Sequence, residues 1–175
     1  MAHSVLLVPV PSLEQFVRER TAHHDAGFVS ADPAFCHAHV TALGPFLPDP
    51  DDEAMEQVAR IAATTSPFDF VLERVATFPD GVIHLVPDPE EPFVALTALL
   101  VEAFPQCPPY GGRFDDVRPH LTLDATADGV DEATVRTSLG DLVPTVCRAE
   151  RLDLTWWECG RCRVLRSWPL GRRPA

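Results

Sequence analysis

The alternation of apolar and polar residues along the chain predicts a protein built from both strands and helices. Segments with the alternation or the short apolar runs typical of β-strands are 4–10, 68–78, 82–86, 146–157 and 163–168. Apolar residues recur at helical spacing in the segments 13–22, 53–63, 90–104 and 131–142. Gly and Pro residues in the connections, such as Pro79-Asp80-Gly81, indicate turns. The pattern therefore favours an α+β protein.

Polar residues precede two of the predicted helices. Ser12 stands directly before the helix 13–22, where its hydroxyl is expected to accept a hydrogen bond from the first turn. The acidic loop 48–52 leads into the helix 53–63, and negative charge suits the positive end of a helix dipole.

Two further predicted strands carry the same short motif, His-x-Thr. The motif residues are His39 and Thr41 in the segment 37–43, and His120 and Thr122 in the segment 118–123. Successive side chains of a strand point to opposite faces, so each imidazole shares a face with the hydroxyl two residues later. The residues between and after them are apolar and are expected to pack on a sheet. Two such strands would form two walls of a polar cleft.

The order of the predicted elements repeats along the chain. Residues 4–78 and 81–157 both read strand, helix, His-x-Thr strand, helix, strand, and 162–169 adds a closing hairpin strand. The sequence LVPVP at 7–11 also resembles LVPDP at 85–89, at nearly the offset that separates the two motifs. We interpret the halves as a duplication, which would place the two histidines across a pseudo-twofold axis.

Length and charge limit the class of protein. A chain of 175 residues is expected to form a single bilobal domain over 1–175 that buries roughly two thirds of its unfolded surface. Its net charge of -12 argues against a stable complex with long nucleic acid, which requires a basic surface. Apolar runs such as 5–10 are too short to cross a bilayer, and the start of the sequence lacks the basic region of a signal peptide. We expect a cytoplasmic monomer.

The segment Cys159-Gly160-Arg161-Cys162 has the spacing of a C-x-x-C motif. A zinc site normally requires a second pair of ligands, and none follows at a suitable spacing. Gly160-Arg161 instead reads as a two-residue hairpin turn that places the two thiols opposite each other. A redox-sensitive disulfide is the alternative.

Two imidazoles and two hydroxyls supply what cleavage of a phosphodiester requires without a metal. One imidazole can deprotonate the attacking water while the other protonates the leaving oxygen, because the pKa of histidine, about 6.5, allows both forms near neutral pH. Threonine hydroxyls can donate hydrogen bonds to the phosphate oxygens. In-line displacement requires the acid and the base on opposite sides of phosphorus, as a pseudo-twofold cleft would provide.

At these residues the sequence resembles the 2H phosphoesterase superfamily, and in particular its bacterial 2′-5′ RNA ligase-like branch. The resemblance implies two pseudo-symmetric lobes of antiparallel sheet with outer helices around a central cleft. It also implies metal-independent opening of 2′,3′-cyclic phosphates, without a cofactor, at an RNA end or on a small nucleotide. His39 would then donate the proton and His120 act as the base, with Thr41 and Thr122 binding phosphate. Formation of 2′-5′ linkages is an alternative activity.

Residues near the motifs are candidates for substrate binding. An aromatic ring can stack on a base and an arginine can attract phosphate. The candidates are Phe46, Tyr110, Arg113 and Arg118. The alternatives are that they only pack the loops, and that Arg118 pairs with Asp115 or Asp116.

Two rival interpretations remain for the motif region. His37 and His39 would share a strand face, with His23 and His24 nearby, which is a spacing that suits zinc. The other rival is a non-catalytic protein that only binds a nucleotide in the cleft. Turnover of a 2′,3′-cyclic nucleotide, measured with and without a chelator, would distinguish the three.

Overall fold

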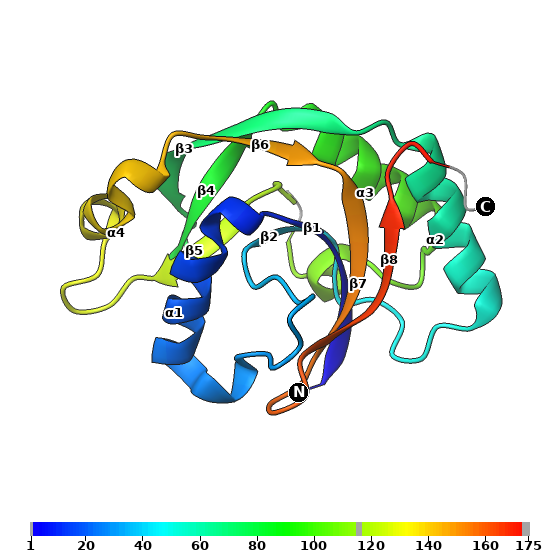
Figure 1. The fold of residues 1–175 in the computed structure, drawn as a ribbon, viewed down its shortest axis with the longest axis horizontal. Helices are drawn as coiled ribbons and strands as arrows, with labels where there is room; N and C mark the ends of the chain where they lie inside the picture. Colours follow the sequence, from blue (N-terminus) through cyan, green and yellow to red (C-terminus); the bar gives the residue numbers. More distant parts are fainter. Residues whose placement is uncertain (1, 115–116, 173–175) are drawn as a thin grey trace.

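The computed structural model describes residues 2–114 and 117–172 of the chain. These residues form two antiparallel sheets of four strands each, with four α-helices outside the sheets (Figure 1). The predicted α+β class, with two sheets flanked by helices, is confirmed.

The first sheet contains the first and the last strands of the described chain. In spatial order its strands are β2 (His39–Leu43), β1 (His3–Pro9), β7 (Arg151–Trp157) and β8 (Arg163–Pro169). The second sheet has the order β5 (Leu121–Ala125), β4 (Val82–Asp88), β3 (Phe68–Thr77) and β6 (Thr145–Ala149). The strand with the first motif, β2, and the strand that begins inside the second motif, β5, are therefore edge strands of different sheets.

The helices follow the predicted segments closely. They are α1 (Glu14–Asp25), α2 (Asp52–Thr64), α3 (Glu91–Ala103) and α4 (Glu132–Leu139). Short 3-10 turns cover Pro11–Leu13, Ala26–Phe28, Pro109–Gly112 and Gly140–Leu142. In Figure 1, α1 and α4 lie toward one end of the long axis, and α2 lies toward the other. No helix of residues 2–114 and 117–172 has the length and apolarity that crossing a bilayer requires.

The expected cap of the first helix is wrong, whereas the acidic start of the second is confirmed. A 3-10 turn precedes α1, so Ser12 lies inside that turn and its hydroxyl contacts the sulfur of Cys147 at 3.5 Å. At α2, the carboxylate of Asp51 accepts a hydrogen bond of 2.9 Å from the backbone N–H of Ala54.

The segment 146–157, predicted as one strand, is two strands in different sheets. β6 pairs with β3 and β7 pairs with β1 and β8, so Glu150 is the point at which the chain passes from one sheet to the other. The alternation of side chains continues through this crossing, which is why the sequence reads as one strand.

The predicted two-residue turn between Cys159 and Cys162 is also wrong. Residues 158–162 connect β7 to β8, and the turn is closed by a hydrogen bond from the N–H of Arg161 to the carbonyl of Glu158. The thiol of Cys159 is exposed, that of Cys162 is buried, and both cysteines are free.

One continuous core joins the two sheets. Fully buried residues such as Leu6 and Val8 of β1 belong to the same apolar cluster as Leu72 of β3 and Leu85 of β4. The sheets do not coincide with the predicted halves, because β3 pairs with β4, and β7 pairs with β1. The duplication of 4–78 and 81–157 stays a prediction.

Candidate active site at the edges of two sheets

The structure brings the two motif strands together. β2 and β5 contact each other although they belong to different sheets. On β2, His39 and Thr41 are partly exposed, while Val40 and Ala42 are buried. On β5, Thr122 is exposed between the buried Leu121 and Leu123. The expected alternation therefore holds, although His120 lies just before β5 and not within it.

Both motif histidines are oriented by the same local hydrogen bond. Nδ1 of His39 lies 2.7 Å from the carbonyl oxygen of His37, and Nδ1 of His120 lies 2.8 Å from the carbonyl oxygen of Arg118. A carbonyl only accepts, so each Nδ1 carries the proton and donates it. The neutral ring then leaves Nε2 unprotonated, with a lone pair available to accept a proton from a ligand.

The environment favours the neutral form of both rings. Burial lowers the pKa of His39 to about 4, and the imidazoles of His120 and His37 act in the same direction. Burial also lowers the pKa of His120, and His84 adds to that effect. Each motif histidine is thus close enough to another imidazole for a charge on one to disfavour a charge on the other.

Tyr110 connects the two motifs. Its hydroxyl interacts with the side chain of Thr41, which acts to lower the pKa of Tyr110, and its ring lies 6.1 Å from the ring of His120 at an angle of 21°. The backbone of Tyr110 has φ 52, in the left-handed region, and its N–H donates to the carbonyl of Gly44 at 2.6 Å. This conformation places the ring of Tyr110 beside His120, and a role of Tyr110 in substrate binding stays a prediction.

A pocket of about 440 Å³ opens beside His39 and Thr122. The ring of Trp157 lies 5.4 Å from that of His39 and forms part of its wall. Helix α1 contributes polar groups, and two of them contact the buried Asp124 of β5. His24 lies 2.7 Å from Asp124, and Arg20 forms an ion pair with the same carboxylate.

No sequence motif pointed to these pocket residues or to His84. Arg20 and His24 lie a hundred positions or more from Asp124 along the chain, and no motif links them. His84 pairs with Thr122 across β4 and β5, and its ring lies 5.4 Å from that of His120. A single imidazole within the apolar strand VIHLV was the available signal.

The other substrate-binding candidates differ in their positions. The prediction for Phe46 is wrong: the residue is 5% exposed, and its ring packs edge-on against Phe104 in the core. Arg113 and Arg118 are exposed, and their roles stay predictions. The suggested partners of Arg118, Asp115 and Asp116, lie outside the described residues.

The zinc alternative meets a competing arrangement at His37. Nδ1 of His37 lies 2.6 Å from Glu14, and its Nε2 accepts a hydrogen bond of 3.1 Å from the N–H of Ser30. Both ring nitrogens are thus occupied. Within the described part of the chain, no three His, Cys, Asp or Glu side chains are grouped so that they could hold a metal ion.

Comparison with known proteins identifies the family. A family model described as the 2′-5′ RNA ligase superfamily matches residues 9–161. The chain therefore belongs to this superfamily of 2H phosphoesterases. A search among curated proteins gave no match.

Solved structures share the fold at low sequence identity. E. coli LigT complexed with 3′-AMP is 18% identical, with a TM-score of 0.58, over 96% of this chain and 97% of the other. The protein TT0787 of Thermus thermophilus is 20% identical, with a TM-score of 0.58, over 98% of both chains. E. coli LigT complexed with NADP+ is 19% identical, with a TM-score of 0.56, over 96% of both chains.

Proposed function

We propose that the protein is a phosphodiesterase that opens 2′,3′-cyclic phosphates by acid and base catalysis between His39 and His120, without a metal. The observation that carries this proposal is the matching orientation of the two rings. Each donates Nδ1–H to the carbonyl two residues earlier, and each leaves Nε2 for chemistry. Membership of the 2′-5′ RNA ligase superfamily supports the proposal, and the matched residues 9–161 include both His-x-Thr motifs.

The proposed reaction is an in-line displacement by water. Nε2 of His120 accepts a proton from the water, whose oxygen forms a bond to phosphorus. The bond from phosphorus to one ribose oxygen breaks, and Nε2 of His39, protonated in the bound state, donates its proton to that oxygen. The hydroxyls of Thr41 and Thr122 donate hydrogen bonds to the non-bridging oxygens. The product is a phosphomonoester, and the two histidines have exchanged protonation states.

The low pKa of His39 suits the role of proton donor. In the free protein the ring is neutral near neutral pH. An anionic phosphate beside it favours the imidazolium form, so substrate binding itself would charge the ring. An imidazolium with a low pKa is also a strong acid, which favours transfer to the leaving oxygen.

We infer that the substrate is a small nucleotide or an RNA end that carries a cyclic phosphate. The related E. coli LigT is known in complexes with 3′-AMP, NADP+, ATP and phosphate. The acidic chain favours such a ligand over a stable complex with long RNA. Ligation is the second candidate, because attack by the 5′-hydroxyl of a second RNA in place of water, with the 3′-oxygen as the leaving group, would form a 2′-5′ linkage in the same cleft.

A panel of cyclic-phosphate substrates tests the proposal. The four 2′,3′-cyclic nucleotides, a cyclic-phosphate RNA end and a cyclic phosphate of an ADP-ribose derivative are incubated with the protein, with and without a chelator. The product isomer, 2′ or 3′, shows which ribose oxygen left. Turnover that persists in chelator supports the proposal. Binding without turnover would indicate the nucleotide-binding alternative, and loss of turnover in chelator would favour a metal.

A further inference from the structure

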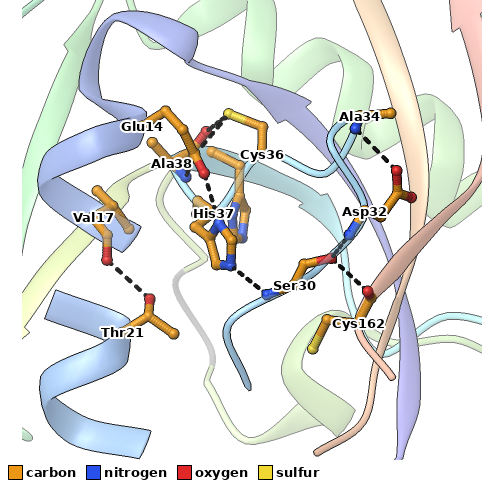
Figure 2. A network of polar contacts seen from close by, with 11 residues as sticks. Glu14, Val17, Thr21, Ser30, Asp32, Ala34, Cys36, His37, Ala38 and Cys162 are labelled. Carbon is orange, nitrogen blue, oxygen red and sulfur yellow. Dashed lines mark hydrogen bonds and ion pairs between the residues drawn. The ribbon is translucent and has the colours of Figure 1, made fainter. Parts of the chain in front are cut away.

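A carboxylate from α1 holds the backbone that leads into β2. Glu14 accepts three hydrogen bonds, from Nδ1 of His37 at 2.6 Å, from the N–H of Ala38 at 3.0 Å and from the thiol of Cys36 at 3.2 Å (Figure 2). These donors are consecutive residues directly before His39. Glu14 therefore fixes the backbone immediately ahead of the first motif.

One of these bonds continues to the motif itself. The N–H of Ala38 and the carbonyl of His37 belong to the same peptide group. That carbonyl accepts the Nδ1–H of His39 at 2.7 Å. A carboxylate on the N–H side of a peptide group polarises it and strengthens its carbonyl as an acceptor. The charge of Glu14 thus reaches His39 through a chain of two hydrogen bonds.

We propose that Glu14 is a positioning residue for His39 and acts through the peptide group between His37 and Ala38. The chain of hydrogen bonds fixes the Nδ1–H tautomer of His39 and stabilises the ring when Nε2 takes up a proton. The inference rests on the proposed function for its catalytic consequence, but the hydrogen-bond chain itself is independent of that function.

The surroundings keep Glu14 ionised and its partners His37 and Cys36 buried. Burial opposes ionisation of Glu14, but hydrogen bonds from His37, Ala38 and Cys36 hold its pKa below the ordinary value. Burial and the charge of Glu14 raise the pKa of Cys36 to about 12, so the thiol stays protonated and donates. His37 is 2% exposed, and its Nε2 accepts a hydrogen bond from the N–H of Ser30. The hydroxyl of Ser30 in turn donates a hydrogen bond of 2.5 Å to the carbonyl of Cys162.

The second motif cannot form the same chain of hydrogen bonds from a carboxylate to its histidine. Nδ1 of His120 donates to the carbonyl of Arg118, and the nitrogen of that peptide group belongs to Pro119. Proline has no N–H, so no carboxylate can polarise this peptide group in the same way. The two histidines are therefore chemically unequal, and His120 serves as an internal control for any effect of Glu14.

The test is an NMR titration of the imidazole nitrogens in the full-length protein. In Glu14→Gln, the pKa of His39 is expected to fall and its Nδ1–H tautomer to become less populated, while His120 titrates as before. Glu19→Gln removes a charge from an exposed position of the same helix and is expected to change neither ring. The other titratable groups around His39 are His37, His120, Arg20, His24, Asp25 and Asp124, and the substitution leaves them all in place.

Unchanged titration of His39 in folded Glu14→Gln would overturn the proposal, as would an equal shift of His120. If the variant does not fold, the unmodified protein provides the measurement. At neutral pH, where the ring of His39 is neutral, its nitrogen signals are expected to show the Nδ1–H tautomer, and the Ala38 amide proton is expected far downfield, as for a proton donated to a carboxylate. An Nε2–H tautomer or an ordinary amide shift would refute the relay.

Kinetics separate this inference from the proposed function. With a cyclic nucleotide as substrate, Glu14→Gln is expected to lower kcat about 10-fold with little change in KM, a loss in the range found for partners that orient a reacting group. If the unmodified protein does not turn over any cyclic phosphate, the phosphodiesterase proposal is refuted. The NMR titration of His39 would still decide whether Glu14 positions that ring.

Discussion

The ring of Tyr110 lies 6.1 Å from the ring of His120, and its hydroxyl interacts with the side chain of Thr41 on the other motif strand. One side chain therefore contacts both motifs, from a loop that belongs to neither motif strand. This contact gives Tyr110 two separable parts, a hydroxyl that orients Thr41 and a ring that covers His120.

Substitution of Tyr110 is expected to separate these two contributions. Tyr110→Phe removes the hydroxyl beside Thr41 but keeps the ring, so kcat/KM should fall by about 2-fold to 10-fold, which is the size of effect that one polar interaction has. Tyr110→Ala also exposes His120 to water, so the loss should be larger and the pKa of His120 should rise toward its ordinary value. Equal effects of the two variants would show that the ring does not contribute.

Loss of either motif imidazole is expected to reduce turnover strongly. His39→Ala and His120→Ala should each lower kcat by about 10²-fold to 10⁴-fold, because each removes one proton-transfer step. Thr41→Ala and Thr122→Ala should have smaller effects through phosphate binding. His23→Ala, on the exposed face of α1, is the matched control and should leave kcat unchanged. A histidine whose alanine variant retains full activity has no part in the mechanism.

The plot of kcat/KM against pH is expected to be bell-shaped, with its maximum at acid pH. The profile of kcat/KM reports the pKa values of the free protein, and burial lowers those of both His39, to about 4, and His120. The optimum of kcat/KM should therefore lie below about pH 6.5, the ordinary pKa of histidine. Bound phosphate favours the charged form of the rings, so the kcat profile should lie at higher pH. Coincident profiles would contradict this.

Asp124 is expected to make folding stability dependent on pH in the acid range. Burial raises the pKa of Asp124, but the N–H of Ala125, His24 and Arg20 lower it more, so the folded value lies below the ordinary one. Its contribution is then complete above the unfolded pKa of about 3.9 and is lost as pH falls through the folded value. Asp124→Asn should cost about 1–3 kcal/mol near neutral pH, because it removes the charged partner of Arg20.

Chemical denaturation at several pH values measures this contribution. The exposed Asp128→Asn is the control and should be as stable as the unmodified protein. A stability of Asp124→Asn that falls with acid as steeply as that of the unmodified protein would assign the dependence to other groups.

The sequence predicted the motif strands because their information is local. A two-residue period placed His39 with Thr41 and His120 with Thr122, and the apolar residues between them fixed which face is buried. The surroundings of the site depend on contacts between distant segments instead. Nothing near Glu14 in the sequence indicates that its carboxylate reaches Ala38.

The errors have the same origin. Phe46 follows a motif strand directly, but its N–H donates to the carbonyl of Ser4, and the chain there runs alongside β1 with the ring turned into the core. The position of Phe46 in the sequence indicated that the residue is near the site. It did not indicate the direction in which the side chain points. The crossing at Glu150 likewise leaves no trace in the alternation of residues.

The passage from β6 to β7 at Glu150 restricts how the molecule can move. A single residue joins strands of opposite sheets, and the same apolar core continues beneath both. A connection of one residue does not allow the two sheets to move far apart. A large movement of one sheet relative to the other would break hydrogen bonds between strands or contacts in the core. If His39 and His120 act together as proposed, the separation of their rings is set when the chain folds, and a ligand would have to fit that preformed width. Changes of substrate preference within this architecture would then have to come from the connecting loops, such as the one that carries Tyr110.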